Sequence, residues 1–208
     1  GKTLTQIAVE QAVASNLFDE IVVSTDSQEI LELGMSLGAS EFPLRPRYLC
    51  EDDTTSYDVV RHAVETLGVG SKTDYVYTLP PTSPFRTAQH IREAHALLQS
   101  CPRATGVLSC VRVPHRFALE KQMVSSADGF LVGIDSGLPV AFDNVAIPQR
   151  LGRNSAIYGV KSGHLDGGLA GSKPIAFMMP ELESVDIDTE QDLALARALA
   201  LFYGRKVS

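Results

Sequence analysis

The chain has 208 residues, of which 44% are hydrophobic and 21% charged, and its formal net charge at pH 7 is −7. This length and apolar content suit one large domain, residues 1–208, with a buried core, which excludes an intrinsically disordered chain. The Lys and Arg residues form no cluster, so we expect no nucleic acid partner. No apolar stretch approaches the roughly 20 residues that cross a bilayer, and the N-terminus lacks a signal-peptide pattern. We therefore expect a cytoplasmic protein that does not bind a membrane.

The cysteines predict no covalent framework. Cys50, Cys101 and Cys110 are odd in number and are not spaced as Cys-x-x-Cys. This pattern favours reduced, partly buried thiols over disulfides or a thiolate zinc site.

Short apolar runs alternate with segments of helical periodicity along the chain. In chain order, the pattern predicts a helix from about residue 4, a strand at 20–25, helices at 27–37 and 55–67, a strand at 74–79, a helix around 91–98, strands at 106–113 and 173–179, and a last helix at about 190–202. Strands that alternate with helices are typical of a mostly parallel sheet with helices on both faces. The sequence therefore predicts a Rossmann-like α/β fold.

One segment interrupts this alternation. Residues 129–152 are rich in glycine, proline and short polar residues, with isolated apolar pairs. This composition favours a hairpin or a protruding arm, which would need a partner surface.

Polar residues follow the first predicted strand, where open α/β sheets bind ligands. Thr25 and Asp26 end the strand at 20–25, and their short side chains suit a ribose or a base in a nucleotide pocket. Alternatively, one of them caps the helix at 27–37.

A second candidate pair lies further along the chain. Arg45 precedes Pro46, and Ser56 lies near the start of the helix at 55–67. The planar guanidinium of arginine suits carbonyl oxygens or phosphate, and a helix start presents free N–H groups. The alternative is a surface arginine beside an ordinary helix cap.

The strand at 74–79 is followed by a proline-rich loop, Pro-Pro-Thr-Ser-Pro-Phe-Arg-Thr, at residues 80–87. A stiff loop binds a small ligand without an ordering cost, which makes Ser83 and Arg86 candidate substrate contacts. The alternative is a rigid connection in which Thr87 caps the next helix.

Two aspartates near the C-terminus give the clearest chemical signal. In an extended segment Asp186 and Asp188 lie on one face, with Ile187 directed oppositely into the core. Paired carboxylates suit Mg²⁺, which takes one or two carboxylates together with substrate phosphate oxygens. Alternatively, Asp188 caps the last helix with Gln191 completing a capping box, and Asp186 is merely solvated.

Read together and in order, these motifs resemble the acylneuraminate cytidylyltransferase family, the CMP-N-acetylneuraminic acid synthetases. The likeness is collinear over nearly the whole chain. It rests on Gly-Lys at 1–2, Phe-Asp at 18–19, residues 21–26, Leu-Arg-Pro at 44–46, Pro-Thr-Ser-Pro at 81–84, Asn-Ser-Ala-Ile-Tyr at 154–158 and Ser-Val-Asp-Ile-Asp-Thr-Glu at 184–190.

The resemblance implies a Mg²⁺-dependent nucleotidyltransferase that transfers CMP from CTP to a sialic-acid-like 2-keto-3-deoxy sugar acid and releases pyrophosphate. By that likeness Arg45 and Ser56 contact the cytosine, and Asp186 and Asp188 form the catalytic metal site. Asn154 and Tyr158 face the sugar. Residues 129–152 match the place of a dimerisation arm, so a homodimer is expected.

Departures from the family pattern gather on the sugar side. Pro80 replaces a glutamine before Pro-Thr-Ser-Pro, and Ser155 replaces a glycine. The expected arginine falls near Asn144, and the family lysine near His115 is displaced, with Lys121 as a stand-in. The family's first strand and phosphate loop are expected before Gly1.

The sequence therefore supports CTP more firmly than any one sugar acid. A 3-deoxy-manno-octulosonate cytidylyltransferase and a non-catalytic cytidine-nucleotide-binding domain stay open as alternatives. A nicotinamide-binding protein is disfavoured because no Gly-x-Gly-x-x-Gly follows a predicted strand.

Overall fold

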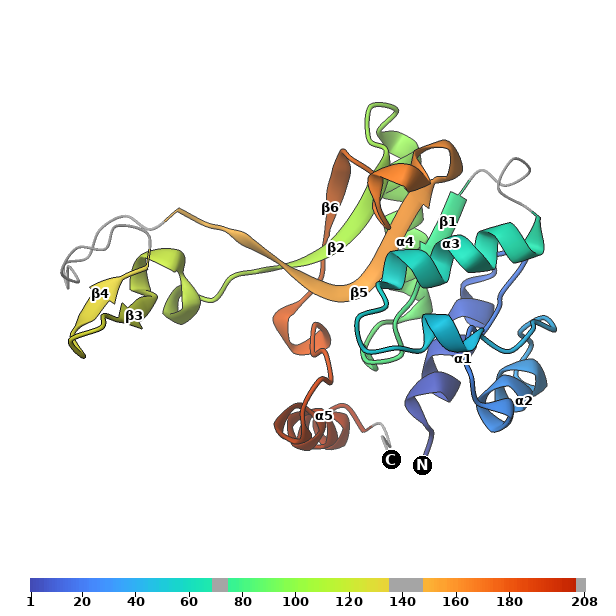
Figure 1. Ribbon diagram of the computed structural model, residues 1–208, viewed down its shortest axis with the longest axis horizontal. Coiled ribbons are helices and arrows are strands. Elements are labelled where there is room, and N and C mark those ends of the chain that lie inside the picture. The colour runs from blue at the N-terminus through green and yellow to red at the C-terminus, as the bar shows by residue number, and fades with distance from the viewer. Residues whose placement is uncertain (69–74, 135–147, 205–208) are drawn as a thin grey trace.

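A four-stranded sheet forms the centre of the computed structural model, which describes residues 1–68, 75–134 and 148–204. The strand order is β1-β5-β2-β6, formed by β1 (Tyr75–Thr78), β5 (Leu151–Lys161), β2 (Gly106–Arg112) and β6 (Pro174–Met178). β2 pairs in parallel with β6, whereas β5 is antiparallel to both β1 and β2. β1, β2 and β6 therefore share one direction, and the α/β class is confirmed as a mixed sheet (Figure 1).

β5 is the strand of the central sheet that was not predicted from the sequence. β5 requires a glycine at Gly159, near its C-terminal end, because a Cβ there would come within 2.5 Å of Cε1 of the Tyr77 ring. The pairing with β2 also shifts register between Leu108 and Cys110. Near this bulge Ser155 has a φ of 57°, which is uncommon for a residue other than glycine.

The predicted strand at 20–25 is extended but joins no ladder within the described residues, so that prediction is wrong in detail. The Ile21 carbonyl accepts from the Ser40 amide at 2.7 Å, and the Thr25 carbonyl accepts from the Arg45 amide at 2.7 Å. These isolated bonds hold the segment against residues 40–45 without forming a sheet.

Each of the five α-helices in the described ranges begins after a serine or threonine whose hydroxyl accepts an amide hydrogen bond. They are α1 (Leu4–Ser15), α2 (Gln28–Ser36), α3 (Ser56–Leu67), α4 (Ala88–Ser100) and α5 (Glu190–Phe202), capped by Thr3, Ser27, Thr55, Thr87 and Thr189. Three capping alternatives weighed from the sequence are therefore settled. Thr87 caps α4 as considered, but Ser27 caps α2 in place of Thr25 or Asp26, and Thr189 caps α5 in place of Asp188. Asp192, not Gln191, completes the α5 capping box.

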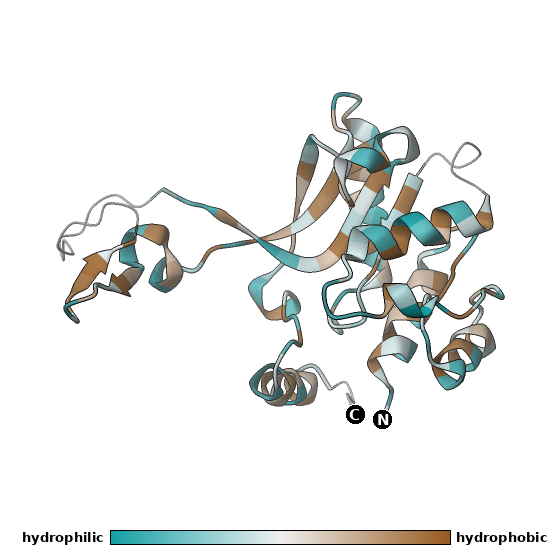
Figure 2. Cartoon of the chain, viewed as in Figure 1, coloured by the Kyte–Doolittle hydropathy of each residue, from teal (hydrophilic) through white to brown (hydrophobic). Residues whose placement is uncertain are grey.

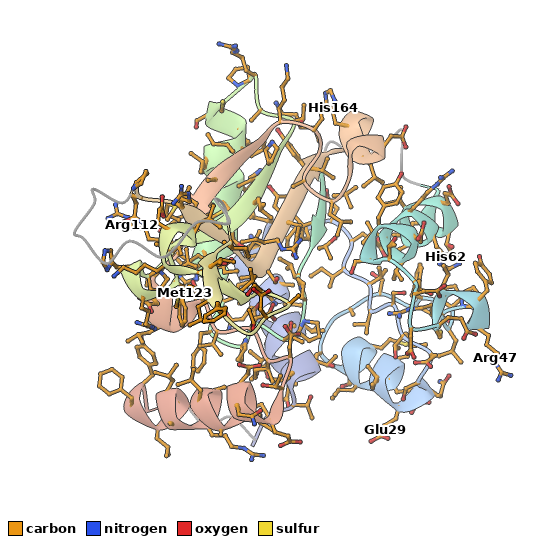
Figure 3. The ribbon with its side chains drawn as sticks, turned by 60° about the vertical axis from the view of Figure 1, so that its left-hand side comes forward. Glu29, Arg47, His62, Arg112, Met123 and His164 are labelled. Carbon is orange, nitrogen blue, oxygen red and sulfur yellow. The ribbon has the colours of Figure 1, made fainter. Side chains whose placement is uncertain are left out.

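The main core lies between α4 and the sheet. Ile91, Ala94 and Leu98 of α4 are fully buried and belong to one cluster with Val107 and Ile157. Figure 3 shows α4 and α3 on opposite sides of the sheet. A second cluster joins Phe85 to α5 through Ala196 and Ala200, with Val185 and Ile187 packed against it.

A long projection leaves the sheet beyond β2 and returns into β5 (Figure 1). We call residues 113–134 and 148–150 the arm; it contains η2 (His115–Phe117), η3 (Leu119–Lys121) and the antiparallel strands β3 (Met123–Ser125) and β4 (Leu131–Gly133). The arm begins well before the predicted segment 129–152, and residues 151–152 belong to β5. Residues 135–147 of that prediction, with Asn144, lie outside the described residues.

None of the helices in the described part of the chain combines the length and the hydropathy needed to span a bilayer. The remaining short 3-10 helices are η1 (Arg47–Leu49), η4 (Ser162–Gly167) and η5 (Glu181–Glu183).

Candidate functional site

Arg45 holds the turn that follows the extended segment at 20–25. Its Nε donates to Ser24 Oγ at 3.2 Å, and its Nη2 donates to the Ser24 carbonyl. Thr25 is buried, and its Oγ1 accepts from the Ser27 amide at 3.1 Å, whereas Asp26 is exposed. Arg45, Thr25 and Asp26 therefore form one group, with the Asp26 carboxylate facing outward.

Ser56 is the first residue of α3 and is exposed. The preceding Thr55 accepts the amide of Asp58, so the Ser56 hydroxyl is not needed as the cap. Among the described residues no hydrogen bond joins Ser56 to Arg45, and its role toward a nucleotide stays a prediction.

The proline-rich loop between β1 and α4 is fixed from within. Arg86 is 2% exposed, and its Nη1 donates to the carbonyls of Pro80 and Ala156, both at 2.8 Å. Burial lowers the pKa of the Arg86 guanidinium to about 10. Ser83 and Phe85 beside it are also buried. The proline-rich loop is therefore held in a rigid conformation by its own buried side chains.

The bulge of β5 is tied to the segment before α5. Asn154 is 4% exposed, and its Nδ2 donates to Ser184 Oγ at 2.8 Å. Its Oδ1 accepts from the Ala156 amide at 3.4 Å. Tyr158 is half-buried and lies in register with Thr78 of β1. The Asn154 side-chain amide therefore bonds to the protein itself, whereas part of the Tyr158 side chain is accessible to solvent.

The aspartate pair lies directly beside the proline-rich loop. The amide of Ile187 donates to the Thr82 carbonyl at 2.9 Å, and the Ile187 side chain packs against the Phe85 cluster. Within residues 1–68, 75–134 and 148–204, the buried Oδ1 of Asp186 has no hydrogen-bond partner, and Asp188 is exposed. Because Thr189 caps α5, neither carboxylate serves that helix start.

These carboxylates fit a hard divalent cation that also binds a ligand. Mg²⁺ is bound by one or two carboxylates plus substrate phosphate oxygens, and the Asp186 Oδ1 is an acceptor that the protein leaves unsatisfied. The described residues contain no group of three or more His, Cys, Asp or Glu side chains placed to hold a metal. The remaining ligands would therefore come from a substrate and water.

Unsatisfied polar atoms gather around this loop. Ser83 Oγ, Arg86 Nε and Asp186 Oδ1 are buried and have no hydrogen-bond partner in the part of the chain that the structure describes. They lie on two segments joined by the Thr82–Ile187 hydrogen bond. Buried polar groups are nearly always hydrogen-bonded in folded proteins. We interpret this junction as the place where a ligand or an ordered water completes the bonding.

The predicted site residues gather at one edge of the sheet, as two groups. β1 and β6 run in the same direction and lead into the proline-rich loop and the aspartate segment, at the edge near α2 and α5 (Figure 1). The Arg45 group flanks α2 in the chain, with Thr25 and Asp26 before the helix and Arg45 after it. Within the described residues no hydrogen bond links the Arg45 group to the loop.

The sequence analysis missed three serines that organise the site. Ser24 receives Arg45, and Ser184 receives Asn154. Ser109 is fully buried in β2, and its Oγ accepts from the Ile157 amide at 2.7 Å. A single hydroxyl among the apolar residues of 107–111 was the available signal for Ser109.

Comparison with known proteins identifies the family. The model of the cytidylyltransferase family matches residues 1–111. The chain belongs to the cytidylyltransferase family. The resemblance to the acylneuraminate cytidylyltransferases, drawn from the motifs, is thereby confirmed.

Two curated relatives carry related names. The chain is 30% identical over 199 residues to N-acylneuraminate cytidylyltransferase of Escherichia coli O18:K1:H7, which covers 94% of this chain and 45% of that protein. It is 37% identical over 98 residues to CMP-N,N'-diacetyllegionaminic acid synthase of Legionella pneumophila, which covers 45% of this chain and 41% of that protein. The match covers less than half of the length of each of these relatives.

A solved structure confirms the cytidylyltransferase fold. It is CMP:2-keto-3-deoxy-manno-octonic acid synthetase complexed with CTP, with a TM-score of 0.65. The two chains are 14% identical, and the match covers 98% of this chain and 89% of that one. At this identity the match speaks for the fold alone.

Proposed function

We propose that this cytidylyltransferase transfers CMP from CTP to a sialic-acid-like 2-keto-3-deoxy sugar acid. The products are a CMP-sugar and pyrophosphate. The observation that carries the proposal is the aspartate pair, with a buried Asp186 oxygen left unsatisfied and an Asp188 carboxylate that caps no helix. The family match and the names of the curated relatives support it.

In the proposed reaction, the anomeric hydroxyl oxygen of the sugar acid forms a bond to the α-phosphorus of CTP. The bond from that phosphorus to the pyrophosphate oxygen breaks, and the hydroxyl proton passes to solvent. Mg²⁺ held by Asp186 and Asp188 would neutralise charge on the phosphate oxygens. The protein's own part is to position the two substrates, and the rigid proline-rich loop suits that role.

The nucleotide side is assigned to the Arg45 group. Nε and Nη2 of Arg45 hold Ser24, which fixes the plane of the guanidinium and leaves Nη1 to donate to a cytosine carbonyl. Asp26 and Thr25 would line the ribose side, and Ser56 the base. We expect Arg45→Ala to raise the KM for CTP more than that for the sugar acid.

The sugar side is assigned to the loop and β5. Tyr158, which is half-buried, and Ser83, whose Oγ is unsatisfied, are proposed to contact the acceptor. Asn154 and Arg86 donate to Ser184 and to backbone carbonyls, so they would act through the shape of the pocket.

A panel of acceptors tests the proposal. The protein is given CTP and Mg²⁺ with N-acetylneuraminic acid, N,N'-diacetyllegionaminic acid or 3-deoxy-manno-octulosonate, and pyrophosphate release is measured. We expect turnover with a nine-carbon acid. Turnover with 3-deoxy-manno-octulosonate alone would support the alternative enzyme. CTP binding by calorimetry without turnover on any acid would instead identify a non-catalytic nucleotide-binding domain.

We further propose that the arm mediates a homodimer. The strands of the arm include hydrophobic residues (Figure 2). Phe130, directly before β4, and Leu131, the first residue of β4, are 70% and 59% exposed. A two-stranded ribbon of this kind is marginal on its own, and an exposed apolar patch marks an interaction surface. Light scattering should give twice the chain mass, and Phe130→Asp with Leu131→Asp should give a monomer. An unmodified chain that is monomeric at assay concentration would refute this assignment.

A further inference from the structure

Arg86 is a buried cation without an anionic partner. Its side chain is 2% exposed, and none of the ion pairs among the described residues includes it. Burying an unpaired charge is costly, and proteins seldom tolerate it without a specific reason. The two carbonyls that Nη1 contacts indicate what that reason is.

The first carbonyl closes the proline-rich loop on itself. Pro80 and Arg86 stand at the two ends of the loop, and the bond from Nη1 to the Pro80 oxygen at 2.8 Å fixes the distance between them. The loop in turn holds the aspartate segment, because the Thr82 carbonyl accepts the Ile187 amide at 2.9 Å. The position of the aspartate pair thus depends on the shape of this loop.

The second carbonyl lies in the bulge of β5. Residues 154–157 have no cross-strand partner in either ladder, since the register passes from Tyr158 directly to Arg153. Arg86 supplies a donor to the Ala156 carbonyl, and Ser109 supplies an acceptor to the Ile157 amide. One guanidinium nitrogen therefore joins the loop to the strand that carries Asn154 and Tyr158.

We propose that Arg86 is a positioning residue that sets the aspartate segment and the sugar-side strand at a fixed distance for the transfer step. This inference rests on the proposed function and refines it, because it assigns Arg86 to geometry and not to substrate binding. Nη1 is engaged by two backbone oxygens, and the buried Nε, which has no partner among the described residues, is assigned to an ordered water and not to the substrate.

The test compares Arg86→Met with Arg86→Lys. Loss of the link displaces reacting groups, and a misplacement of 1 Å costs on the order of 100-fold in rate. We therefore expect Arg86→Met to lower kcat by about that factor with the KM values for CTP and sugar acid unchanged. Arg86→Lys should recover most of the rate, because an ammonium can donate to both carbonyls. Arg61→Met is the control, since Glu65, on the exposed face of α3, is the only ion-pair partner of Arg61 among the described residues.

Three results would overturn the inference. A raised KM for the sugar acid with kcat retained would make Arg86 a substrate ligand. A lowered Tm with kcat per folded molecule retained would make it a purely structural residue. An Arg86→Lys variant that is folded but as slow as Arg86→Met would show that the guanidinium itself acts on the substrate.

Amide hydrogen exchange separates this inference from the proposed function. If the unmodified protein turns over no sugar acid, the function fails, but the link can still be measured. Arg86→Met should then speed exchange of the Ile187 amide, which donates to the loop, and Arg61→Met should not. Equal Ile187 exchange in both variants would contradict the positioning role.

Discussion

Replacing Phe85 by alanine tests whether the proline-rich loop and α5 stabilise each other. Phe85 is fully buried and joins the loop to Ala196 and Ala200 of α5, with Val185 and Ile187 packed against them. Removing a buried phenylalanine ring costs about 3–5 kcal/mol in the free energy of unfolding. For a chain of this length that loss corresponds to a fall in Tm of roughly 6–20 °C.

The assay is thermal unfolding by circular dichroism, with Phe202→Ala as the matched control. Phe202 is the last residue of the same helix and is 77% exposed, so its loss should change Tm by only about 1–2 °C, as for ordinary surface substitutions. Activity is then measured well below both midpoints. Because Ile187 lies between the two aspartates, Phe85→Ala should also lower kcat in the folded state. Equal Tm values for the two variants would refute the packing argument.

Four further substitutions address single features of the fold and of the site. Ser155 has a left-handed backbone conformation, which costs a residue other than glycine about 1–2 kcal/mol. Ser155→Gly removes this strain but adds a glycine entropy cost of about 0.5–1 kcal/mol. Tm should therefore rise slightly, and a clear fall would contradict the strain. Burial lowers the pKa of His95, whose Nδ1 lies 2.9 Å from Tyr77 Oη. Its neutral form therefore contributes stability that is complete above about pH 6.5 and is lost as pH falls toward the folded pKa. Denaturant unfolding at pH 7 and pH 5.5 should show a smaller acid loss in His95→Gln than in the unmodified protein, and an equal loss would exclude this histidine as the cause. Thr189→Ala removes the α5 cap and should lower the free energy of unfolding by about 0.5–2 kcal/mol. Asp188→Asn should instead abolish turnover and leave Tm unchanged. An Asp188→Asn variant with a lowered Tm and retained turnover would make Asp188 a structural residue.

Local patterns in the sequence were enough to predict the helices. The stripe of residues 55–67 became α3, and the helix around 91–98 became α4, because a hydroxyl cap and an apolar face act within a few residues. The choice of cap was less secure. Ser27 and Thr189 cap α2 and α5 in place of the neighbouring aspartates Asp26 and Asp188. Neighbouring residues have similar capping ability, and the backbone angles at the start of the helix decide which of them is the cap.

The sheet was harder to predict because pairing depends on residues far apart in the chain. β5 escaped because its Gly159 and the bulge at Ser155 interrupt the apolar alternation that marks a strand. The apolar pattern at 20–25 predicts a strand, but a ladder forms only where another strand pairs with the segment, and none does among the described residues. Burial of the site residues was not predicted either. Asn154 and Arg86 were expected to contact the substrate, but their side chains donate to Ser184 and to backbone carbonyls.

The most direct test of the account is where a divalent cation binds in the complex with CTP. Crystals of the protein grown with CTP and Mn²⁺, measured at the manganese absorption edge, give the cation position from anomalous scattering. The account predicts one peak coordinated by carboxylate oxygens of Asp186 and Asp188 and by phosphate oxygens of the nucleotide. A peak elsewhere on the triphosphate, with both aspartates turned away from it, would contradict the proposed metal site.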